Sequence, residues 1–242
     1  MKGVLYNINP SATVVDISNS VQSYDLLDGA LTIAQAYSYY PKDTIHVVVV
    51  DPGVGTSRRP ILVTAGTHYF VAPDNGVLSL VYEREERVSV RHITSSHYFL
   101  EPVSQTFHGR DIFAAVAGWL SKGMEPSKFG ETIDDYVRFT APRAKNGESN
   151  QLKGIVLKVD KFGSLITNIT PADVPEMFGG QFKINVGNAA IMKLVTNYAE
   201  GAKGEVVAIL GSGGFLEISV NKGSAAQVAG ANKGSEVTVT MG

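Results

Sequence analysis

HVVVVDPGVGTSRRPILV, residues 46–63, is the stretch that decides the fold class. Apolar residues run without alternation into Asp51, and Pro52, Gly53 and Gly55 then interrupt the run before a second apolar segment. This pattern predicts a strand buried on both faces, a tight turn and another strand. Ligands of open α/β sheets bind at the carboxyl ends of strands, so Asp51 is the first candidate for a functional carboxylate. The alternative is a structural Asp that caps backbone N–H groups in an ordinary turn.

The residues on both sides of this stretch predict an α/β domain. Residues 12–17 form a short apolar segment typical of a strand, and residues 25–40 carry apolar side chains at helical spacing. Strand, helix and strand in this order are typical of a βαβ unit. A further strand is predicted at residues 68–71, followed by a turn at 74–76. We therefore expect an α/β N-terminal domain with a mostly parallel sheet, spanning residues 1–145.

The composition excludes several classes of protein. The chain has 242 residues, of which 44% are hydrophobic and 18% charged, enough for one large domain or two modest ones. A net charge of −2 gives no electrostatic signature of nucleic-acid or anionic-membrane binding. Without a signal peptide or a run of about 18 apolar residues, a soluble cytoplasmic protein is expected. The absence of cysteine excludes disulfides, thiolate metal sites and cysteine nucleophiles.

A second group of polar residues, TFHGRD at 106–111, precedes an apolar helical pattern that continues to Leu120. A histidine at a helix N-terminus meets the positive end of the helix dipole, which lowers its pKa and keeps the imidazole neutral. A neutral imidazole accepts a proton or polarises a water molecule, so His108 is a candidate for catalysis. The alternative is a histidine that only bonds a backbone group, with Asp111 as a first-turn charge.

The composition changes at residues 142–153, PRAKNGESNQLK, which hold no large apolar residue before Leu152 and predict a linker. Short apolar segments separated by Gly, Asn and Pro follow, which predict a C-terminal all-β, barrel-like domain over residues 153–242. Glycines in the turns at 160–168 and 211–214 let a backbone approach a ligand closely, although a β-turn alone also explains them.

Five motifs carry a resemblance to a known family: VDPGVGTSR, APDNGVL, TFHGRD, VDKFGSLITNI and GSGGFLEISVNKG. In this order, over nearly the whole chain, they resemble the S-adenosylmethionine hydroxide adenosyltransferases, hydrolytic relatives of the fluorinase and chlorinase. The resemblance implies hydrolysis of S-adenosyl-L-methionine to adenosine and L-methionine, without a metal or redox cofactor. It also implies a homotrimer, with each active site between the N-terminal domain of one subunit and the C-terminal domain of the next.

The resemblance also implies roles for particular residues. Asp51, Arg58 and His108 fall on the positions that hold and activate water, and Arg59 is the competing choice for the arginine. Gly109 stands where the halogenating relatives carry a serine that helps to hold the halide, which favours water as the nucleophile. The substrate-binding positions comprise three aromatic residues for stacking, an acid for the methionine ammonium and two serines: Tyr24, Phe162, Tyr198, Asp160, Ser164 and Ser212.

Three positions depart from the family pattern. The family normally begins with a strand and an Asp-Phe-Gly stretch that binds the ribose hydroxyls. Met1-Lys2-Gly3 corresponds to a later point, so we expect that first strand and those acids to be absent from this sequence. Asn19 replaces a common histidine, and Ser164 replaces the usual adenine-contacting asparagine.

Two functions from other classes stay open at this stage. Asp51, His108 and Asp111 are possible ligands of a divalent metal in a hydrolase, although no second histidine stands at ligand spacing. Alternatively, the chain is a relative that binds adenosine or S-adenosylmethionine without turning it over. The two readings differ in their response to a chelator and in whether product forms.

Overall fold

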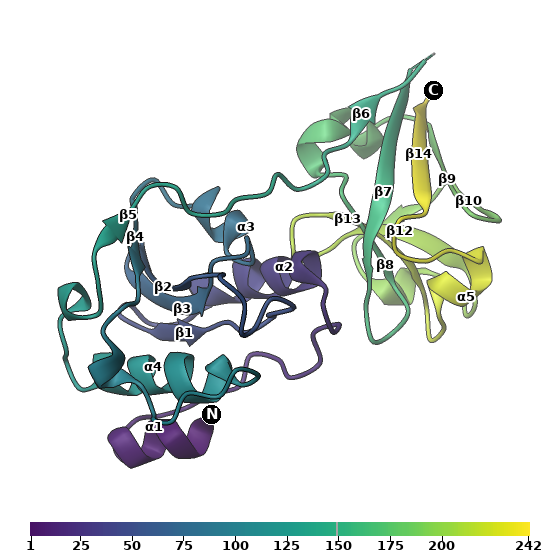
Figure 1. The fold of residues 1–242 in the computed structure, drawn as a ribbon. Coiled ribbons are helices and arrows are strands. Elements are labelled where there is room, and N and C mark those ends of the chain that lie inside the picture. The colour runs from purple at the N-terminus through teal and green to yellow at the C-terminus, as the bar shows by residue number, and fades with distance from the viewer. Residues whose placement is uncertain (149) are drawn as a thin grey trace. The chain divides into compact units, whose positions relative to one another are not determined.

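The computed structural model describes residues 1–148 and 150–242 and divides the chain into two compact units, Met1–Ala141 and Pro142–Gly242. Figure 1 shows the mixed α and β elements of the first unit and the predominantly β elements of the second. Ser149, which falls in the predicted linker, lies outside the described residues. Each unit has its own hydrophobic core. No helix in the described ranges combines the length and apolar character needed to cross a membrane.

The N-terminal unit contains a five-stranded sheet with the order β1-β3-β2-β4-β5. The pair β1–β3 is parallel, and the pairs β2–β3, β2–β4 and β4–β5 are antiparallel. The strand bounds, in chain order, are β1 (Ile45–Val47), β2 (Pro60–Ala65), β3 (His68–Pro73), β4 (Val88–His92) and β5 (Thr132–Ile133).

The prediction of a mostly parallel sheet is therefore wrong. The decisive feature is the connection between β2 and β3, which is only Gly66 and Thr67 long. A link of two residues joins antiparallel neighbours, whereas parallel neighbours need a crossover of a dozen or more residues. The prediction depended on a strand–helix–strand unit that begins at residues 12–17, where no strand forms, and β2 is an antiparallel strand that is covered on both faces. Leu62 packs with one hydrophobic cluster, and Ile61 and Val63 pack with the other.

The apolar segment at residues 46–50 also differs from its prediction. Only Ile45–Val47 is assigned as strand β1, which lies at the edge of the sheet. Pairing continues one residue further, where Val48 donates its N–H to the carbonyl of Val71 at 3.0 Å. Val49 is 38% exposed, so the segment is not buried on both faces. The predicted strand at residues 12–17 is not assigned as a strand.

Helices cover both faces of the sheet in the N-terminal unit. The predicted helix at 25–40 forms as α2 (Leu26–Ala36) with a 3-10 turn at Tyr37–Tyr39, and Asp25 caps it by accepting the N–H of Asp28. Figure 1 shows α2 and α3 on one face of the sheet and α1 and α4 together on the other face. The remaining helical elements are α1 (Lys2–Ile8), α3 (Ser79–Tyr82), a π-helical turn (Gly109–Phe113), α4 (Ala114–Ser121) and 3-10 turns at Ser96–Tyr98 and Pro126–Lys128.

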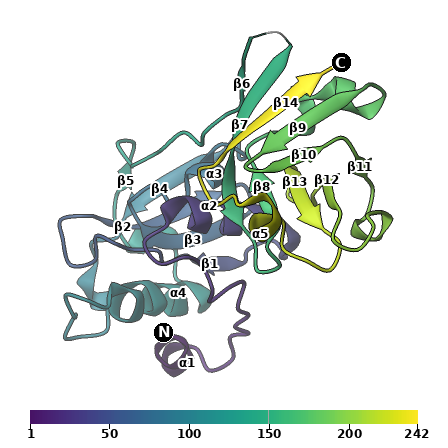
Figure 2. The same ribbon diagram turned by 90° about the vertical axis from the view of Figure 1, so that its right-hand side faces the viewer.

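The C-terminal unit is built on a nine-stranded sheet. Eight strands follow the order β10-β9-β14-β7-β8-β13-β12-β11, and the ninth, β6, pairs with β7. Its strands curl around one core, as Figure 2 shows. The strand bounds are β6 (Lys145–Asn146), β7 (Gln151–Val159), β8 (Leu165–Thr167), β9 (Phe182–Val186), β10 (Ala189–Ile191), β11 (Leu194–Val195), β12 (Val206–Leu210), β13 (Leu216–Val220) and β14 (Glu236–Met241).

The prediction of an all-β barrel needs correction as well. In the described part of the chain, β10 and β11 end the path without pairing to each other, so the sheet is a curled half-barrel. The unit also contains α5 (Ala225–Ala229), which Ser224 caps, and three 3-10 turns. These turns span Pro171–Asp173, Pro175–Phe178 and Tyr198–Glu200. The short apolar segments predicted the strands, but closure depends on pairing between strands far apart in sequence.

Ile184→Ala tests the core of the C-terminal unit. Ile184 is fully buried, so the substitution leaves a cavity and should lower the free energy of unfolding by about 2–5 kcal/mol. Met192→Ala is the matched control, because Met192 is 71% exposed in the same unit. The control should change that free energy by less than about 0.5 kcal/mol. Urea unfolding measures both variants, and equal losses would contradict the burial of Ile184.

Candidate functional site

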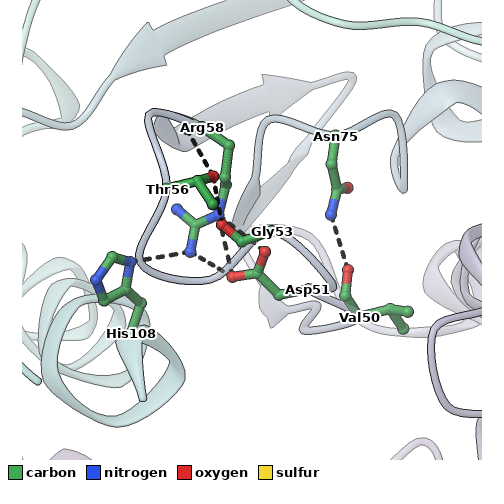
Figure 3. A network of polar contacts seen from close by, with 7 residues as sticks. All are labelled: Val50, Asp51, Gly53, Thr56, Arg58, Asn75 and His108. Carbon is green, nitrogen blue, oxygen red and sulfur yellow. Dashed lines mark hydrogen bonds and ion pairs between the residues drawn. The ribbon is translucent and has the colours of Figure 1, made fainter. Parts of the chain in front are cut away.

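The turn after β1 brings Asp51 and Arg58 into a buried ion pair. Arg58 Nε donates to Asp51 Oδ1 at 2.9 Å and to Oδ2 at 3.0 Å, and Nη2 also contacts Oδ2. The side chains of Asp51 and Arg58 are only 5% and 8% exposed. Figure 3 shows the guanidinium and the carboxylate facing each other across the turn. The sequence-predicted acid and arginine therefore lie in direct contact.

The shape of this turn explains why its residues are small. Gly55 adopts a φ of +78°, and a Cβ at this position would overlap the carbonyl oxygen of Gln105. The hydroxyl of Thr56 donates to the carbonyl of Gly53 at 2.7 Å and closes the turn. The turn thus packs directly against the segment that leads to His108, and only glycine fits at the contact.

His108 immediately precedes the π-helical turn that leads into α4 and completes a three-residue cluster. Nη2 of Arg58 lies 3.0 Å from Nδ1 of His108 (Figure 3). A guanidinium only donates, so Nδ1 is the acceptor and the proton of the neutral ring sits on Nε2. Burial and the charge of Arg58 lower the pKa of His108, against the opposing charges of Asp51 and Asp111. The cluster thus combines a carboxylate, a cation and an imidazole biased towards its neutral form.

Arg58 has hydrogen-bonding capacity that the described protein atoms do not use. Among the residues the structure describes, its Nη1 is the one buried side-chain nitrogen or oxygen without a hydrogen-bond partner. A buried donor without a partner is destabilising, and such groups in native proteins call for an explanation. An oxygen atom of a small ligand or of water satisfies Nη1 without moving the ion pair. This donor is the strongest local indication of a binding position.

Arg59 belongs to a different cluster. Its Nε and Nη2 donate to Asp74 Oδ2 at 2.9 and 2.7 Å, and its Nη1 donates to Asp135 Oδ1 at 2.7 Å. Asn75, in the same predicted turn as Asp74, donates from Nδ2 to the carbonyl of Val50 at 2.8 Å (Figure 3). The geometry thus separates the two adjacent arginines, and Arg58 is the one that meets Asp51.

A pocket of about 440 Å³ lies beside the Asp51 end of β1. Tyr24 and Asp51 line it, together with Asn19 and residues 47–50. Tyr24 is 80% exposed and has a φ of +66°. Two of the residues predicted for the N-terminal part of the site therefore share one cavity.

The predicted substrate residues of the C-terminal unit gather at its turns. Asp160 Oδ1 accepts the backbone N–H groups of Phe162 at 2.9 Å and Ser164 at 2.8 Å. Phe162 is 70% exposed, whereas Ser164 is buried and its hydroxyl accepts from that of Ser219 at 3.0 Å. The 160–164 turn therefore holds three predicted residues in one arrangement.

The remaining two predicted residues lie near a glutamate that the sequence analysis did not select. The hydroxyl of Tyr198 donates to Glu217 Oε2 at 3.2 Å. Ser212 follows Gly211, whose backbone packs against Oε1 of Glu217. The available sequence signal was a single acid inside the apolar segment FLEISV. Alternation along a strand places its side chain on the face opposite to the side chains of its two neighbours.

The residues proposed for a metal site do not form one cluster. Asp111 is held by Arg110, with Nε–Oδ1 and Nη2–Oδ2 distances of 2.6 and 2.9 Å, whereas Asp51 is held by Arg58. In residues 1–148 and 150–242, no group of three or more His, Asp or Glu side chains is placed to hold a metal ion. The geometry gives no support to Asp51, His108 and Asp111 as a shared ligand set.

The N-terminal unit thus places a pocket beside a buried arginine and an imidazole, and the C-terminal unit gathers polar and aromatic side chains at its turns. Models of the SAM hydroxide adenosyltransferase N-terminal and C-terminal domains match residues 1–130 and 154–238. The chain belongs to the SAM hydroxide adenosyltransferase family. The resemblance seen in the five sequence motifs is thus confirmed.

Individual relatives cover nearly the whole chain. The (R)-S-adenosyl-L-methionine hydrolase of Salinispora tropica is 34% identical over 99% of this chain and 91% of the relative. The enzyme of the same name from Thermus thermophilus is 32% identical over 98% of this chain and 91% of the relative. The crystal structure of an uncharacterized conserved protein from Thermotoga maritima has a TM-score of 0.91 and 34% identity, covering 99% of this chain and 93% of that one.

Arg58→Met tests the energetics of the buried pair. The substitution leaves the buried carboxylate of Asp51 without its cation and should lower the free energy of unfolding by about 3–5 kcal/mol. The double variant Asp51→Asn/Arg58→Met should recover part of this loss, because no buried charge remains. The exposed pair of Lys193 and Glu205 supplies the control: Lys193→Met should cost less than about 1 kcal/mol. Urea unfolding decides, and additive losses in the double variant would contradict the pairing.

Proposed function

We propose that this protein hydrolyses S-adenosyl-L-methionine to adenosine and L-methionine through attack of water on C5′. The observation that carries the proposal is the unpartnered, buried Nη1 of Arg58 next to Asp51 and His108. Family membership supports the reaction, since relatives named as hydrolases of this compound are 32–34% identical over nearly the whole chain. The proposal assigns the reacting oxygen to the donor that the protein itself leaves unsatisfied.

The chemistry requires little beyond an oriented nucleophile. The C5′–S bond breaks with its electron pair passing to the sulfonium sulfur, and methionine leaves as a neutral thioether. The bond from C5′ to the water oxygen forms at the same time, and one proton of that water must depart. A site that fixes the oxygen in line with C5′ gains by orientation, and fixed donors stabilise its developing hydroxide-like charge.

Each residue of the cluster has a separate task in this proposal. Arg58 donates from Nη1 to the attacking oxygen, and Asp51 fixes the guanidinium through Nε and Nη2. His108 accepts the departing proton, directly or through a second water, on Nδ1 as its contact with Arg58 opens. The proton then passes to solvent, and the cluster returns to its starting state.

The substrate-binding residues extend the proposal to both units. Tyr24 stacks on the adenosyl group from the pocket that it shares with Asp51. Phe162 and Tyr198 supply further aromatic faces, and Ser164 takes the adenine-contacting position. Asp160 binds the methionine ammonium, and Ser212 lies near its carboxylate. Domains at 1–145 and 153–242, a homotrimer with active sites between subunits and a cytoplasmic location stay predictions.

The first test is turnover in the presence of EDTA, followed by chromatography for adenosine and methionine. The wild-type chain should form both products, because the proposed mechanism uses no metal ion. Binding of S-adenosylmethionine without product would identify a non-catalytic relative. Activity that EDTA removes and a divalent cation restores would identify a metal-dependent hydrolase instead. Either result would overturn the proposed reaction or its metal independence.

Variants of the cluster test the assigned residues. Asp51→Asn, Arg58→Lys and His108→Ala should each lower kcat by about 10²- to 10⁴-fold, because each disturbs the nucleophile or its proton transfer. Arg59→Lys is the matched control for Arg58→Lys, since Arg59 pairs with Asp74 and Asp135 instead. Circular dichroism checks that every variant is folded. A larger loss in Arg59→Lys than in Arg58→Lys would reverse the choice of arginine.

The pH dependence of kcat/KM tests the state of His108. Its pKa is lowered from 6.5, so the imidazole stays neutral at pH values where an ordinary histidine is already partly protonated. The rate should be constant through neutral pH and should fall only as the pH drops through that lowered pKa. The residual activity of His108→Ala should lack this limb. A limb above pH 6.5, or one retained in His108→Ala, would refute the assignment.

A further inference from the structure

Glu217 is a buried carboxylate that the proposed mechanism does not use. It lies in the middle of β13, where its neighbours Leu216 and Ile218 belong to the hydrophobic core. Alternation along the strand turns Glu217 to the opposite face, yet the residue is only 8% exposed. Its directly paired residues are Ile209 on β12 and Ile166 on β8. An acidic side chain in such apolar surroundings is costly unless a partner satisfies it.

The partners of this carboxylate come from turns that carry predicted substrate residues. Tyr198 donates its hydroxyl to Oε2 at 3.2 Å. Oε1 packs against Gly211, where a Cβ would overlap it, so the turn bearing Ser212 is shaped around Glu217. Burial raises the pKa of Glu217, the hydrogen bond from Tyr198 lowers it, and the nearby charge of Asp160 raises it further. Ser219 follows Glu217 by two residues on the same face of β13 and donates its hydroxyl to Ser164, whose N–H Asp160 accepts, so both acids belong to one polar cluster.

The two carboxylates leave acceptor capacity that the described protein atoms do not fill. Asp160 uses Oδ1 for two backbone N–H groups, and its Oδ2 makes no hydrogen bond with the described residues. No Lys, Arg or His within residues 1–148 and 150–242 forms an ion pair with Glu217 or Asp160. Two neighbouring acids without a protein cation form a site suited to a cationic group of a ligand. An ammonium fits because it carries three donors and no acceptor.

We propose that Glu217 binds the ammonium group of the substrate's methionine part together with Asp160, as a second carboxylate of the same subsite. This inference rests on the proposed function, because it names a contact to the same substrate. The hydroxyl of Tyr198 fixes Oε2, and the contact with Gly211 fixes Oε1, so the carboxylate is held in place before the ligand arrives. The substrate carboxylate is repelled by Glu217 and binds instead at Ser212, the residue after Gly211.

The test measures binding and turnover separately, with the full chain. Isothermal titration calorimetry compares S-adenosyl-L-homocysteine with an analogue that lacks only its α-amino group. Glu217→Gln keeps the shape of the side chain and removes its charge. It should raise the Kd for S-adenosyl-L-homocysteine about 10- to 100-fold and should change the Kd for the des-amino analogue less than about threefold. For S-adenosylmethionine, KM should rise while kcat stays within about threefold of wild type.

A matched control is Glu236→Gln on β14 of the same unit, since Glu236 is exposed. This variant should bind both compounds like the wild type. Equal weakening of both compounds by Glu217→Gln would assign Glu217 a purely structural role and overturn the inference, as would unchanged binding of both. Amine-dependent binding through Glu217 without turnover by the wild type would uphold the subsite and refute the hydrolysis. Normal turnover with no effect of Glu217→Gln would uphold the hydrolysis and refute the subsite.

Discussion

The ion pair between Asp51 and Arg58 is the interaction on which the N-terminal cluster depends. Removing both charges from water is expensive, and such a pair is a weak source of stability compared with apolar packing. Its value lies in position: the carboxylate uses Nε and Nη2 and leaves Nη1 with free donors. The glycine at position 55 lets the turn carrying this pair touch the segment before His108. A change in the turn therefore disturbs acid, arginine and imidazole together.

The cation also determines what the imidazole is able to do. Because Arg58 donates to Nδ1, the neutral tautomer with its proton on Nε2 is selected, and the positive charge disfavours a second proton. The charge of Asp51 acts in the opposite sense and raises the pKa of His108, which favours proton uptake by the imidazole. In the proposed mechanism, the same guanidinium stabilises negative charge on the attacking oxygen and holds His108 in the form that accepts a proton. The contacts of Arg58 with Asp51 and His108 thus link the roles proposed for the three residues.

Local sequence patterns selected polar residues that lie in contact in the structure, but they did not predict the pairing of the strands. Asp51 and His108 were selected from the apolar run and the polar cluster in the sequence, and the structure brings both into contact with Arg58. The prediction of a parallel sheet was wrong because residues 12–17 form no strand to complete the strand–helix–strand unit, and the two-residue link between β2 and β3 joins antiparallel neighbours. Glu217 was missed because one acid in an apolar strand gives no local sign of its partners. The curling of the C-terminal sheet likewise depends on pairing between strands that are far apart in the sequence, which local patterns do not reveal.

In the proposed function, the two polar clusters bind different parts of the same substrate through opposite charges. In the N-terminal unit, a buried arginine has a surplus of donors, which matches an oxygen atom that gains negative charge during the reaction. In the C-terminal unit, Asp160 and Glu217 have a surplus of acceptors, which matches an ammonium that is cationic throughout. The ammonium contact is equal in ground state and transition state, so it strengthens binding. The arginine contact grows as charge develops, so it accelerates the chemical step.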